Sequence, residues 1–478
     1  MILFDPFVES SNHWGWLLLY ASHAGLVVLA LLHMLYQRRS PQNLMAWLFA
    51  LILLPLIGVV LYWVFGSRKL LYKRNKSNIE WALTAQQQCQ VTAPDQTLAN
   101  QQAQLLAYHH LPGVAVCGEI KLLHADDVWL AFANCIEQAQ TSIYIETYIY
   151  EWDQTGQWLA QRLIDKAQAG LVVKVLLDAV GSFDLYRHQK KLDRMRQAGV
   201  EVAFFQPFFK TFFRQQVNLR NHRKIYVFDH RTVLTGGMNV SNDYFGAQPQ
   251  TAQAPRWVDL MFQMQGAVAS VYTQVFQADW QYTTGHGLVL ASASACQART
   301  QTCIQVVPSG PDMLGDGLFE SLLQAIYQAR TDITLVTPYF IPDNSVMTAL
   351  LVALKRGVKV TLISPHRSDH LIFDLGRSSY MRELAEAGGQ VFLYPSGMLH
   401  AKLLLFDQKA ILFGTANLDY RSLFINYEMA AWCYDNSLIA RIQPLIETLQ
   451  DKSQLLPAQT TQGRRLFENL TRIFAPLL

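Results

Sequence analysis

The stretch "NHRKIYVFDHRTVLTGGMN" begins at Asn221, and "LHAKLLLFDQKAILFGTAN" begins at Leu399. Each reads His, any residue, Lys, four residues, Asp, six residues, Gly, a small residue, any residue and Asn. A single copy would be a weak sign of a site, because a strand can present a His and a Lys to solvent. Two copies, with their histidines 178 positions apart, predict two related structural units.

The alternating residues of "HRKIYVFD" predict a strand, on which residues two apart point to the same side. His222 and Lys224 therefore share a face. The segment "TVLTGGMN" predicts the returning strand of a hairpin, which brings Asn239 back beside His222. Asp229 falls at the turn, where shaping the turn or pairing with nearby cations is a better interpretation than chemistry. The second copy repeats the arrangement with His400, Lys402, Asp407 and Asn417.

Other segments recur in the same order along the chain. "IYIETYIYEWD" from Ile143 matches "ITLVTPYFIPD" from Ile333, and "AGVEV" from Ala198 matches "AGGQV" from Ala387. Helix-like and strand-like segments alternate, as in 158–169 followed by "VVKVLLD" at 172–178, which is typical of an α/β fold. We therefore expect two tandem halves at residues 113–290 and 303–478, joined by a linker at 291–302.

Two stretches without charge, residues 14–36 and 44–65, are each long enough to cross a hydrocarbon core of about 30 Å. They predict a transmembrane helical hairpin within residues 1–76, followed by a Gln-rich tether at 77–112. No Lys or Arg precedes the first stretch, two lie between the stretches and five follow the second, which predicts that the remainder is cytoplasmic. The five are also expected to attract anionic membrane lipids; they are Arg68, Lys69, Lys73, Arg74 and Lys76.

Two further apolar segments have alternative interpretations. "FFQPFFKTFFR" at 204–214 is either a lipid-contacting lip beside the site or a strand end followed by buried aromatic residues. In the C-terminal tail, one helical face is apolar, and we expect this face to dock on the protein rather than on lipid. Its residues are Leu466, Phe467, Leu470, Ile473 and Phe474.

The composition is 51% apolar with a formal net charge of +3, so the chain can fold but has no polycationic surface. Nucleic acid is therefore not an expected partner. Six scattered cysteines without CxxC pairs predict neither a zinc site nor a disulfide framework, and they fit a reduced cytosolic setting.

If the two halves pack about a pseudo-two-fold axis, the two patterns meet in one cleft with two imidazoles, two ammonium groups and two amides. That set suits a phosphodiester: cations and amides hold the phosphate oxygens, one histidine attacks phosphorus, and the other protonates the leaving alcohol. Metal binding is a weaker interpretation, because the lysines repel a divalent ion and no carboxylate cluster accompanies them. The second nitrogen of each imidazole needs a hydrogen-bond acceptor that fixes its tautomer. The candidates are Asp259, 37 residues after His222, and Glu428, 28 residues after His400.

Through these motifs the chain resembles the phospholipase D superfamily, whose signature is the doubled HxKxxxxD motif. Within that superfamily it resembles the bacterial cardiolipin synthases. The narrower resemblance rests on the apolar hairpin before two such halves, on "NLRNHRK", on "TPYFIPD" and on "GTANLDYRSLFINYE" around Asn417. It implies two α/β/α halves with a shared central active site, in a multi-pass protein of the bacterial cytoplasmic membrane whose catalytic part is cytoplasmic.

The resemblance also implies an activity. Two phosphatidylglycerol molecules give cardiolipin and glycerol, without cofactor or metal, through a phosphatidyl-histidine intermediate on His222, with His400 as acid and base. Asp229 and Asp407 belong to the motif and enter the catalytic set on that ground, despite the turn interpretation. Gly237 stands where the second copy has Thr415. The other implied roles are phosphate binding by Lys224, Lys402, Asn239 and Asn417, and orientation of the histidines by Asp259 and Glu428.

Three alternatives remain open. Water can release the same intermediate, which would make the protein a phospholipase D-type hydrolase, or a nuclease if the substrate were nucleic acid. The hairpin and the phenylalanine-rich segment favour transfer to a lipid alcohol, with either phosphatidylglycerol or phosphatidylethanolamine as the second substrate. An inactive membrane scaffold is the alternative from a different class, and the presence of both His–Lys pairs argues against it.

Overall fold

A computed structural model of the chain describes residues 6–36, 41–66, 81, 96–207, 217–246, 256–287 and 302–472. The chain forms two compact units. One comprises Met1–Lys73 with Phe208–Asn218, and the other comprises Arg74–Pro207 with Leu219–Leu478. Both copies of the repeated pattern lie in the second unit.

The first unit contains the apolar helices α1 (Pro6–Tyr36), α2 (Pro41–Leu53) and α3 (Ile57–Phe65). Within the described ranges, only Trp14–Tyr36 is a helix long and apolar enough to cross a membrane, with a mean hydropathy of 1.9. The expected second span at 44–65 is not one helix. Pro55 has no N–H to donate and Leu56 has a φ of 65°, so α2 ends at Leu53 and α3 starts a new helix at Ile57.

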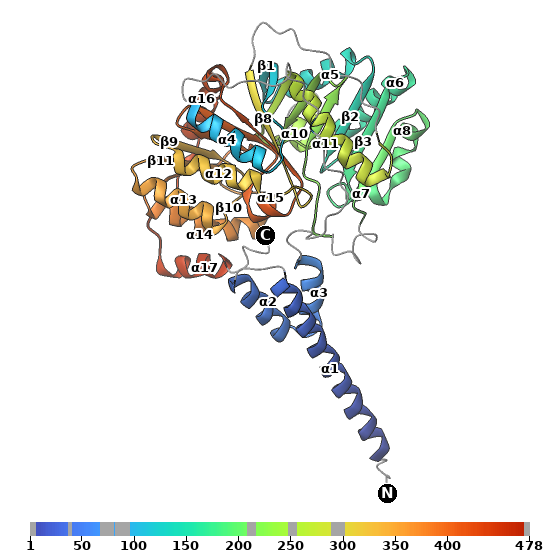
Figure 1. Ribbon diagram of the computed structural model, residues 1–478, viewed down its shortest axis with the longest axis vertical. Helices are drawn as coiled ribbons and strands as arrows, with labels where there is room; N and C mark the ends of the chain where they lie inside the picture. The colour runs from blue at the N-terminus through green and yellow to red at the C-terminus, as the bar shows by residue number, and fades with distance from the viewer. Residues whose placement is uncertain are drawn as a thin grey trace. The chain divides into compact units, whose positions relative to one another are not determined.

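The second unit is organised around one mixed sheet, which has fifteen strands among the described residues. Its order is β17-β12-β11-β9-β13-β14-β16-β8-β1-β7-β6-β5-β2-β3-β4 (Figure 1). The first-half strands are β1 (Ala115–Leu123), β2 (Ser142–Thr147), β3 (Val172–Asp178), β4 (Glu201–Phe205), β5 (Ile225–Phe228), β6 (Thr232–Gly236) and β7 (Met261–Gly266). The others are β8 (Thr302–Ser309), β9 (Asp332–Val336), β11 (Lys359–Pro365), β12 (Gln390–Tyr394), β13 (Leu403–Phe406), β14 (Ala410–Gly414), β16 (Glu428–Cys433) and β17 (Gln454–Leu455).

The sheet order shows the internal repeat directly. β1 and β8 pair antiparallel at the centre, where Ala115 lies opposite Ile304. Outward from β1 the order is β7, β6, β5, β2, β3, β4, and outward from β8 it is β16, β14, β13, β9, β11, β12. These two series correspond strand by strand, and among the described strands of this sheet only the short edge strand β17 has no counterpart. The expected tandem α/β architecture is confirmed, and the antiparallel centre relates the halves by a pseudo-two-fold axis.

Helices cover both faces of the sheet, as the side chains of β2 show. Ile143 and Ile145 join the core formed with α5 (Asp126–Gln138) and α6 (Gln154–Gln168). Tyr144 points to the opposite face, because successive strand residues alternate, and stacks on Phe276 of α11 (Ala267–Thr284) with ring centroids 5.0 Å apart. The first half is therefore a three-layer α/β/α arrangement.

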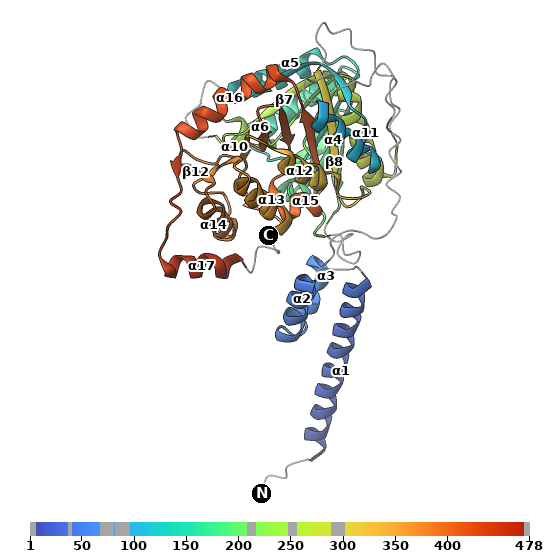
Figure 2. The same cartoon turned by 60° about the vertical axis from the view of Figure 1, so that its left-hand side comes forward.

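The C-terminal helix α17 (Gln462–Arg472) docks on the protein through a different face from the one expected. It lies beside α14 (Leu371–Glu386) in both views (Figures 1 and 2), and it faces α14 with its charged side. Glu468 receives two hydrogen bonds from the buried guanidinium of Arg382 on α14. The prediction that the apolar face docks on the protein is therefore wrong for Leu466, Phe467 and Leu470, which are exposed because this ion pair fixes the helix the other way round.

The cysteines are not all reduced, as their scattered positions had led us to expect. Cys303 is disulfide-bonded, whereas Cys135 and Cys433 are free and buried. Spacing along the sequence does not report which cysteines come together in space. Several predicted segments lie outside the described residues: residues 77–80 and 82–95 of the tether, the linker at 291–301, residues 208–214 of the phenylalanine-rich segment, the five basic residues after the second span, and Ile473 with Phe474. The later part of the predicted tether is not an extended linker but contains the helix α4 (Gln96–Tyr108), which packs against α12 (Gly317–Gln328), where Gln102 donates to the carbonyl of Ser321.

Candidate active site

The two His–Lys pairs lie immediately before equivalent strands, not within them. Ile225 begins β5 directly after Lys224, and Leu403 begins β13 directly after Lys402. The preceding backbone is drawn to the opposite half: the N–H of His222 donates to the carbonyl of Tyr427 at 2.9 Å, and the N–H of His400 donates to that of Val258 at 2.7 Å. These bonds tie the two halves together at the histidines.

Each imidazole is held by a carboxylate from the other half. Nδ1 of His222 lies 3.0 Å from Oε2 of Glu428, and Nδ1 of His400 lies 2.6 Å from Oδ2 of Asp259. Sequence spacing counted each carboxylate from the histidine of its own half, and the structure corrects that pairing. The cause is the backbone pairing just described, because Tyr427 and Val258 directly precede Glu428 and Asp259. With Nδ1–H donated to a carboxylate, Nε2 is left as the reactive nitrogen of each ring.

The two lysines lie against the histidines and are fully enclosed. Nζ of Lys224 donates to the carbonyl of His222 at 2.8 Å. Nζ of Lys402 donates to the carbonyl of His400 and lies 2.7 and 2.9 Å from the two nitrogens of its ring. Burial disfavours the charged form, which lowers the pKa of Lys224 to about 7 and that of Lys402 to about 8.

The remaining titratable groups form one electrostatic cluster. Burial lowers the pKa of His222, and it lowers the pKa of His400 well below the ordinary value, with further lowering by Lys402, Lys224 and His222. His222 contributes to the lowered pKa of His400, and Lys402 contributes to that of His222, so charged groups of the two halves act on one another. Burial raises the pKa of Asp259 to about 7. For Glu428, burial acts in the same direction, but the charges of His222 and Lys224 outweigh it and the pKa is lowered overall.

The motif aspartates lie at the far end of the strands. Asp229 directly follows β5, about 16 Å along an extended chain from Lys224. Its carboxylate accepts the backbone N–H groups of residues 140–142 and the hydroxyl of Thr141. Asp407 does the same for residues 330–332 and Thr331. Both residues have positive φ, 52° and 51°. The turn interpretation fits this geometry, and the membership of Asp229 and Asp407 in the catalytic set does not.

Asp229→Ala is therefore expected to lower the free energy of unfolding by about 2 kcal/mol, because several backbone N–H groups lose their acceptor. The kcat of the folded protein should stay within about twofold of the parent, since the strand separates Asp229 from the histidines. Thermal unfolding and kcat of the full chain measure the two effects. Asp407→Ala is the matched variant in the other half. A kcat loss of about 100-fold without destabilisation would contradict the turn role.

The two asparagines lie in different surroundings. Oδ1 of Asn239 accepts the N–H of Ile149 at 3.1 Å, and its Nδ2 donates to the hydroxyl of Tyr244 at 2.9 Å. The Tyr244 ring in turn contacts His400, with centroids 5.2 Å apart. Asn417 shares a small internal cavity with Lys402, and its buried Oδ1 has no hydrogen-bond partner.

One asymmetry between the halves concerns Gly237 and Thr415. The hydroxyl of Thr415 donates to Oε2 of Glu428, the same oxygen that faces His222. At Gly237, a Cβ atom would meet both carboxylate oxygens of Asp259, at 2.3 and 2.4 Å. The shorter aspartate thus fills the space that a side chain at residue 237 would need.

Aromatic residues that sequence reasoning missed enclose the histidines. Tyr148 contacts the ring of His222 and Trp257 contacts that of His400, with centroids 5.1 and 5.3 Å apart. A signal was present, because Trp257 stands two residues before Asp259. Tyr339 also approaches His400, at 6.5 Å, and its hydroxyl donates to Asp369.

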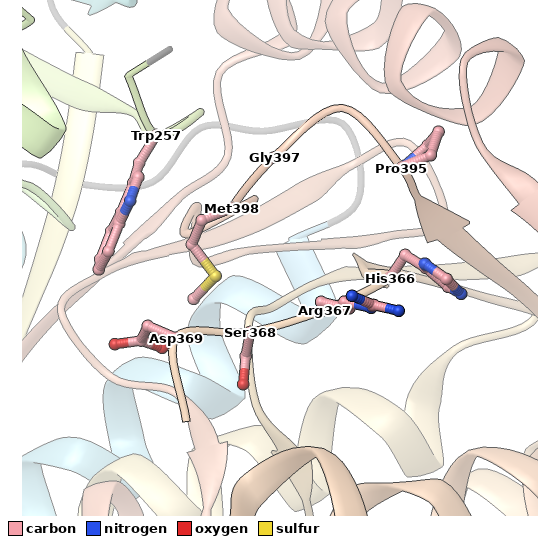
Figure 3. A pocket seen from close by; sticks show the side chains of 8 residues that line it. All are labelled: Trp257, His366, Arg367, Ser368, Asp369, Pro395, Gly397 and Met398. Atoms are coloured by element: carbon pink, nitrogen blue, oxygen red, sulfur yellow. The ribbon is translucent and has the colours of Figure 1, made fainter. Parts of the chain in front are cut away.

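A pocket of about 510 Å³ adjoins His400 through the ring of Trp257. Figure 3 shows Trp257, Met398, Ser368 and Asp369 together at one end, with Arg367 and His366 pointing the other way. This end offers an aromatic face beside a carboxylate and a hydroxyl. Within the described ranges, no group of three or more His, Cys, Asp or Glu side chains is arranged to hold a metal ion.

Comparison with known proteins identifies clear relatives. The family described as "Cardiolipin synthase, PLD-like domain" matches residues 132–280 and 322–449, and "Phospholipase_D-nuclease N-terminal" matches residues 25–67. "Cardiolipin synthase 1" of Bacillus anthracis is 31% identical over 465 residues, which cover 92% of this chain and 90% of the relative. "Cardiolipin synthase A" of Pectobacterium carotovorum subsp. carotovorum (strain PC1) is 31% identical over 483 residues, covering 97% and 98%.

A solved structure shares the fold. The phosphatidylserine synthase of Haemophilus influenzae Rd KW20 aligns with a TM-score of 0.58 at 18% identity, covering 80% of this chain and 98% of the other. At this identity the likeness concerns the fold alone.

Proposed function

Because the chain belongs to the cardiolipin synthase family of phospholipase D-like enzymes, and so is a membrane-associated phospholipid synthase, we propose that it joins two phosphatidylglycerol molecules into cardiolipin and releases glycerol. One observation carries the proposal. Two imidazoles, one from each half, belong to a single buried cluster, and each has Nδ1 held by a carboxylate of the other half. Two Nε2 atoms are thereby presented beside two lysines, as an in-line displacement at phosphorus requires.

In the first step, Nε2 of His222 attacks the phosphorus of one phosphatidylglycerol. The P–N bond forms, the bond from phosphorus to the glycerol oxygen breaks, and protonated His400 gives its proton to that oxygen. Glu428 stabilises the positive charge that develops on the His222 ring. The low pKa of His400 makes its protonated form a strong acid, and the bound phosphate anion favours that protonated form.

In the second step, the free hydroxyl of a second phosphatidylglycerol gives its proton to Nε2 of His400. The resulting oxygen attacks phosphorus, the P–N bond breaks, and cardiolipin leaves with His400 protonated for the next cycle. The end of the pocket beside Trp257 suits the second glycerol headgroup: Asp369 accepts from its hydroxyls, Ser368 can donate, and Trp257 covers its carbon atoms.

The lysines predict a pH dependence of binding. Below a pKa of about 7 for Lys224 and about 8 for Lys402, both carry the positive charge that holds the phosphate oxygens. As the pH rises through these values the free site loses this charge, so KM for phosphatidylglycerol should rise by up to about tenfold per unit for each lysine. KM measured between pH 6 and 9 tests this expectation. Lys402→Arg should flatten the upper part of the curve, because a guanidinium stays charged. A KM independent of pH would contradict it.

We also propose the membrane topology. α1 spans the bilayer, and α2 with α3 form a second, broken crossing, so that the following basic residues and both halves, 113–290 and 303–478, are cytoplasmic. Support comes from the charge pattern and from the packing of Tyr62 on α3 against Met34 on α1.

Purified full-length protein in phosphatidylglycerol vesicles with EDTA tests the reaction. Cardiolipin and glycerol in equal amounts are the expected products. Phosphatidic acid as the sole lipid product would instead establish hydrolysis, which uses the same histidine intermediate with water as acceptor. Vesicles that also contain phosphatidylethanolamine show whether this lipid serves as the phosphatidyl donor, which would release ethanolamine, and we expect no ethanolamine release.

A further inference from the structure

α17 has two chemically different sides, and the protein holds the charged one. Arg382 of α14 donates from Nε at 2.6 Å and from Nη2 at 3.0 Å to the carboxylate of Glu468. Arg465 pairs with Glu386 at 2.9 Å, and Arg472 pairs with Glu383 at 2.6 Å. The side chains of Arg382 and Glu468 are both buried, so this ion pair fixes the rotation of α17 about its axis.

The other side of α17 is apolar and faces away from α14. The exposed fractions are 73% for Leu466, 51% for Phe467 and 55% for Leu470. Residues at i, i+1 and i+4 form one stripe on a helix. A stripe of three large apolar side chains left in water is unfavourable, because exposed apolar surface lowers stability in proportion to its area. An ion-paired helix that presents such a stripe indicates a surface for an apolar partner.

We propose that α17 lies flat in the membrane interface, with Leu466, Phe467 and Leu470 inserted among the lipid acyl chains. Charge complementarity identifies the partner as an anionic bilayer. The side chains of Arg464 and Arg465 stay 62% and 59% exposed although they pair with Glu468 and Glu386, so their outer N–H groups can still meet headgroup phosphates. A phospholipid synthase must also reach substrates that reside in a bilayer. The proposal needs only this phospholipid class, not transfer as opposed to hydrolysis.

The position of α17 gives the contact a consequence for the site. α14 begins at Leu371, immediately after the loop that carries Ser368 and Asp369 beside His400. The helix that docks α17 is therefore the one that leads from the substrate pocket. A bilayer contact at α17 would hold the pocket of the second half at a fixed distance from the lipid surface.

Photochemical crosslinking tests the occupant of the stripe. Benzoylphenylalanine replaces Phe467 in the full-length protein, which is reconstituted in phosphatidylglycerol–phosphatidylethanolamine vesicles with tritium in the acyl chains of the ethanolamine lipid. Light should attach lipid to the protein at least about fivefold more than in the control, because only position 467 is expected to reach the acyl chains. The control carries the same residue at Leu130 of α5, an isolated leucine that is 56% exposed. Crosslinked dimers, crosslinks to residues 473–478, or lipid labelling equal to the control would overturn the proposal.

A kinetic comparison separates this role from the chemistry. Leu466→Asp with Leu470→Asp should lower the total consumption of phosphatidylglycerol in vesicles about tenfold, because two charges now oppose insertion. Activity on monomeric dihexanoyl phosphatidylglycerol should be unchanged, since the site is intact, and Leu130→Asp should leave both activities unchanged. Total consumption counts transfer and hydrolysis alike, so the result does not depend on the proposed reaction. Unaltered vesicle activity, or equal loss on both substrates, would contradict an interfacial role.

Discussion

His222→Ala and His400→Ala are each expected to lower turnover at least about 10³-fold, because the two imidazoles act as one unit. Without His222 no P–N bond can form. Without His400 the leaving glycerol oxygen departs unprotonated and the incoming hydroxyl keeps its proton. Steady-state turnover of the full-length variants in phosphatidylglycerol vesicles measures both losses.

The same variants assign the two roles. Radiolabelled phosphatidylglycerol should leave acid-labile label on His222 of the parent and of His400→Ala, and none on His222→Ala. His230→Ala provides the control: this histidine is also largely buried, but it follows Asp229 at the far end of β5 and packs against Tyr144, so its kcat should match the parent. Parent-like activity in either of the first two variants would remove that residue from the mechanism.

Much of the architecture could be predicted from the sequence because the same pattern of residues occurs in both halves. The spacing from His222 to Asn239 and from His400 to Asn417 follows the β5–β6 and β13–β14 hairpins, whose short turns fix the pairing of the strands. The turn role of Asp229 also followed from local chemistry. Local patterns of this kind depend on neighbours in the chain, so one sequence is enough to read them.

Contacts between distant segments could not be predicted in the same way. The residue types that hold the histidines were identified, but the partners cross between halves, because Asn221 pairs with Tyr427 and Leu399 with Val258 about the pseudo-two-fold axis. No local spacing carries that information. The predicted orientation of α17 was wrong for a similar reason. Its amphipathic pattern was clear, but Arg382, which binds Glu468 and so fixes the orientation, lies 86 residues away in the sequence. The break at Pro55 is different, since proline is visible in the sequence and its effect on a helix is general.

Gly237→Thr is expected to lower kcat about 100-fold although it only copies the residue found at position 415. The new Cβ would lie 2.3 Å from an oxygen of Asp259, so the carboxylate must move away from Nδ1 of His400. That carboxylate is buried and also accepts the N–H of Leu260 at 2.7 Å, so the pocket offers no easy alternative position. His400 then loses the acceptor that fixes its tautomer. Single-turnover rates in vesicles measure the loss.

The second half shows how the loss can be reversed. There, the longer Glu428 leaves room for Thr415 and accepts a hydrogen bond from its hydroxyl. Adding Asp259→Glu to Gly237→Thr reproduces that arrangement, so the double variant should recover at least about tenfold of the lost kcat, a coupling that additive effects would not produce. Thr415→Gly is the matched control. It removes one hydrogen bond to Glu428 without a clash, and it should cost about tenfold or less. A double variant no better than Gly237→Thr would show that the two carboxylates do not hold their histidines in equivalent ways.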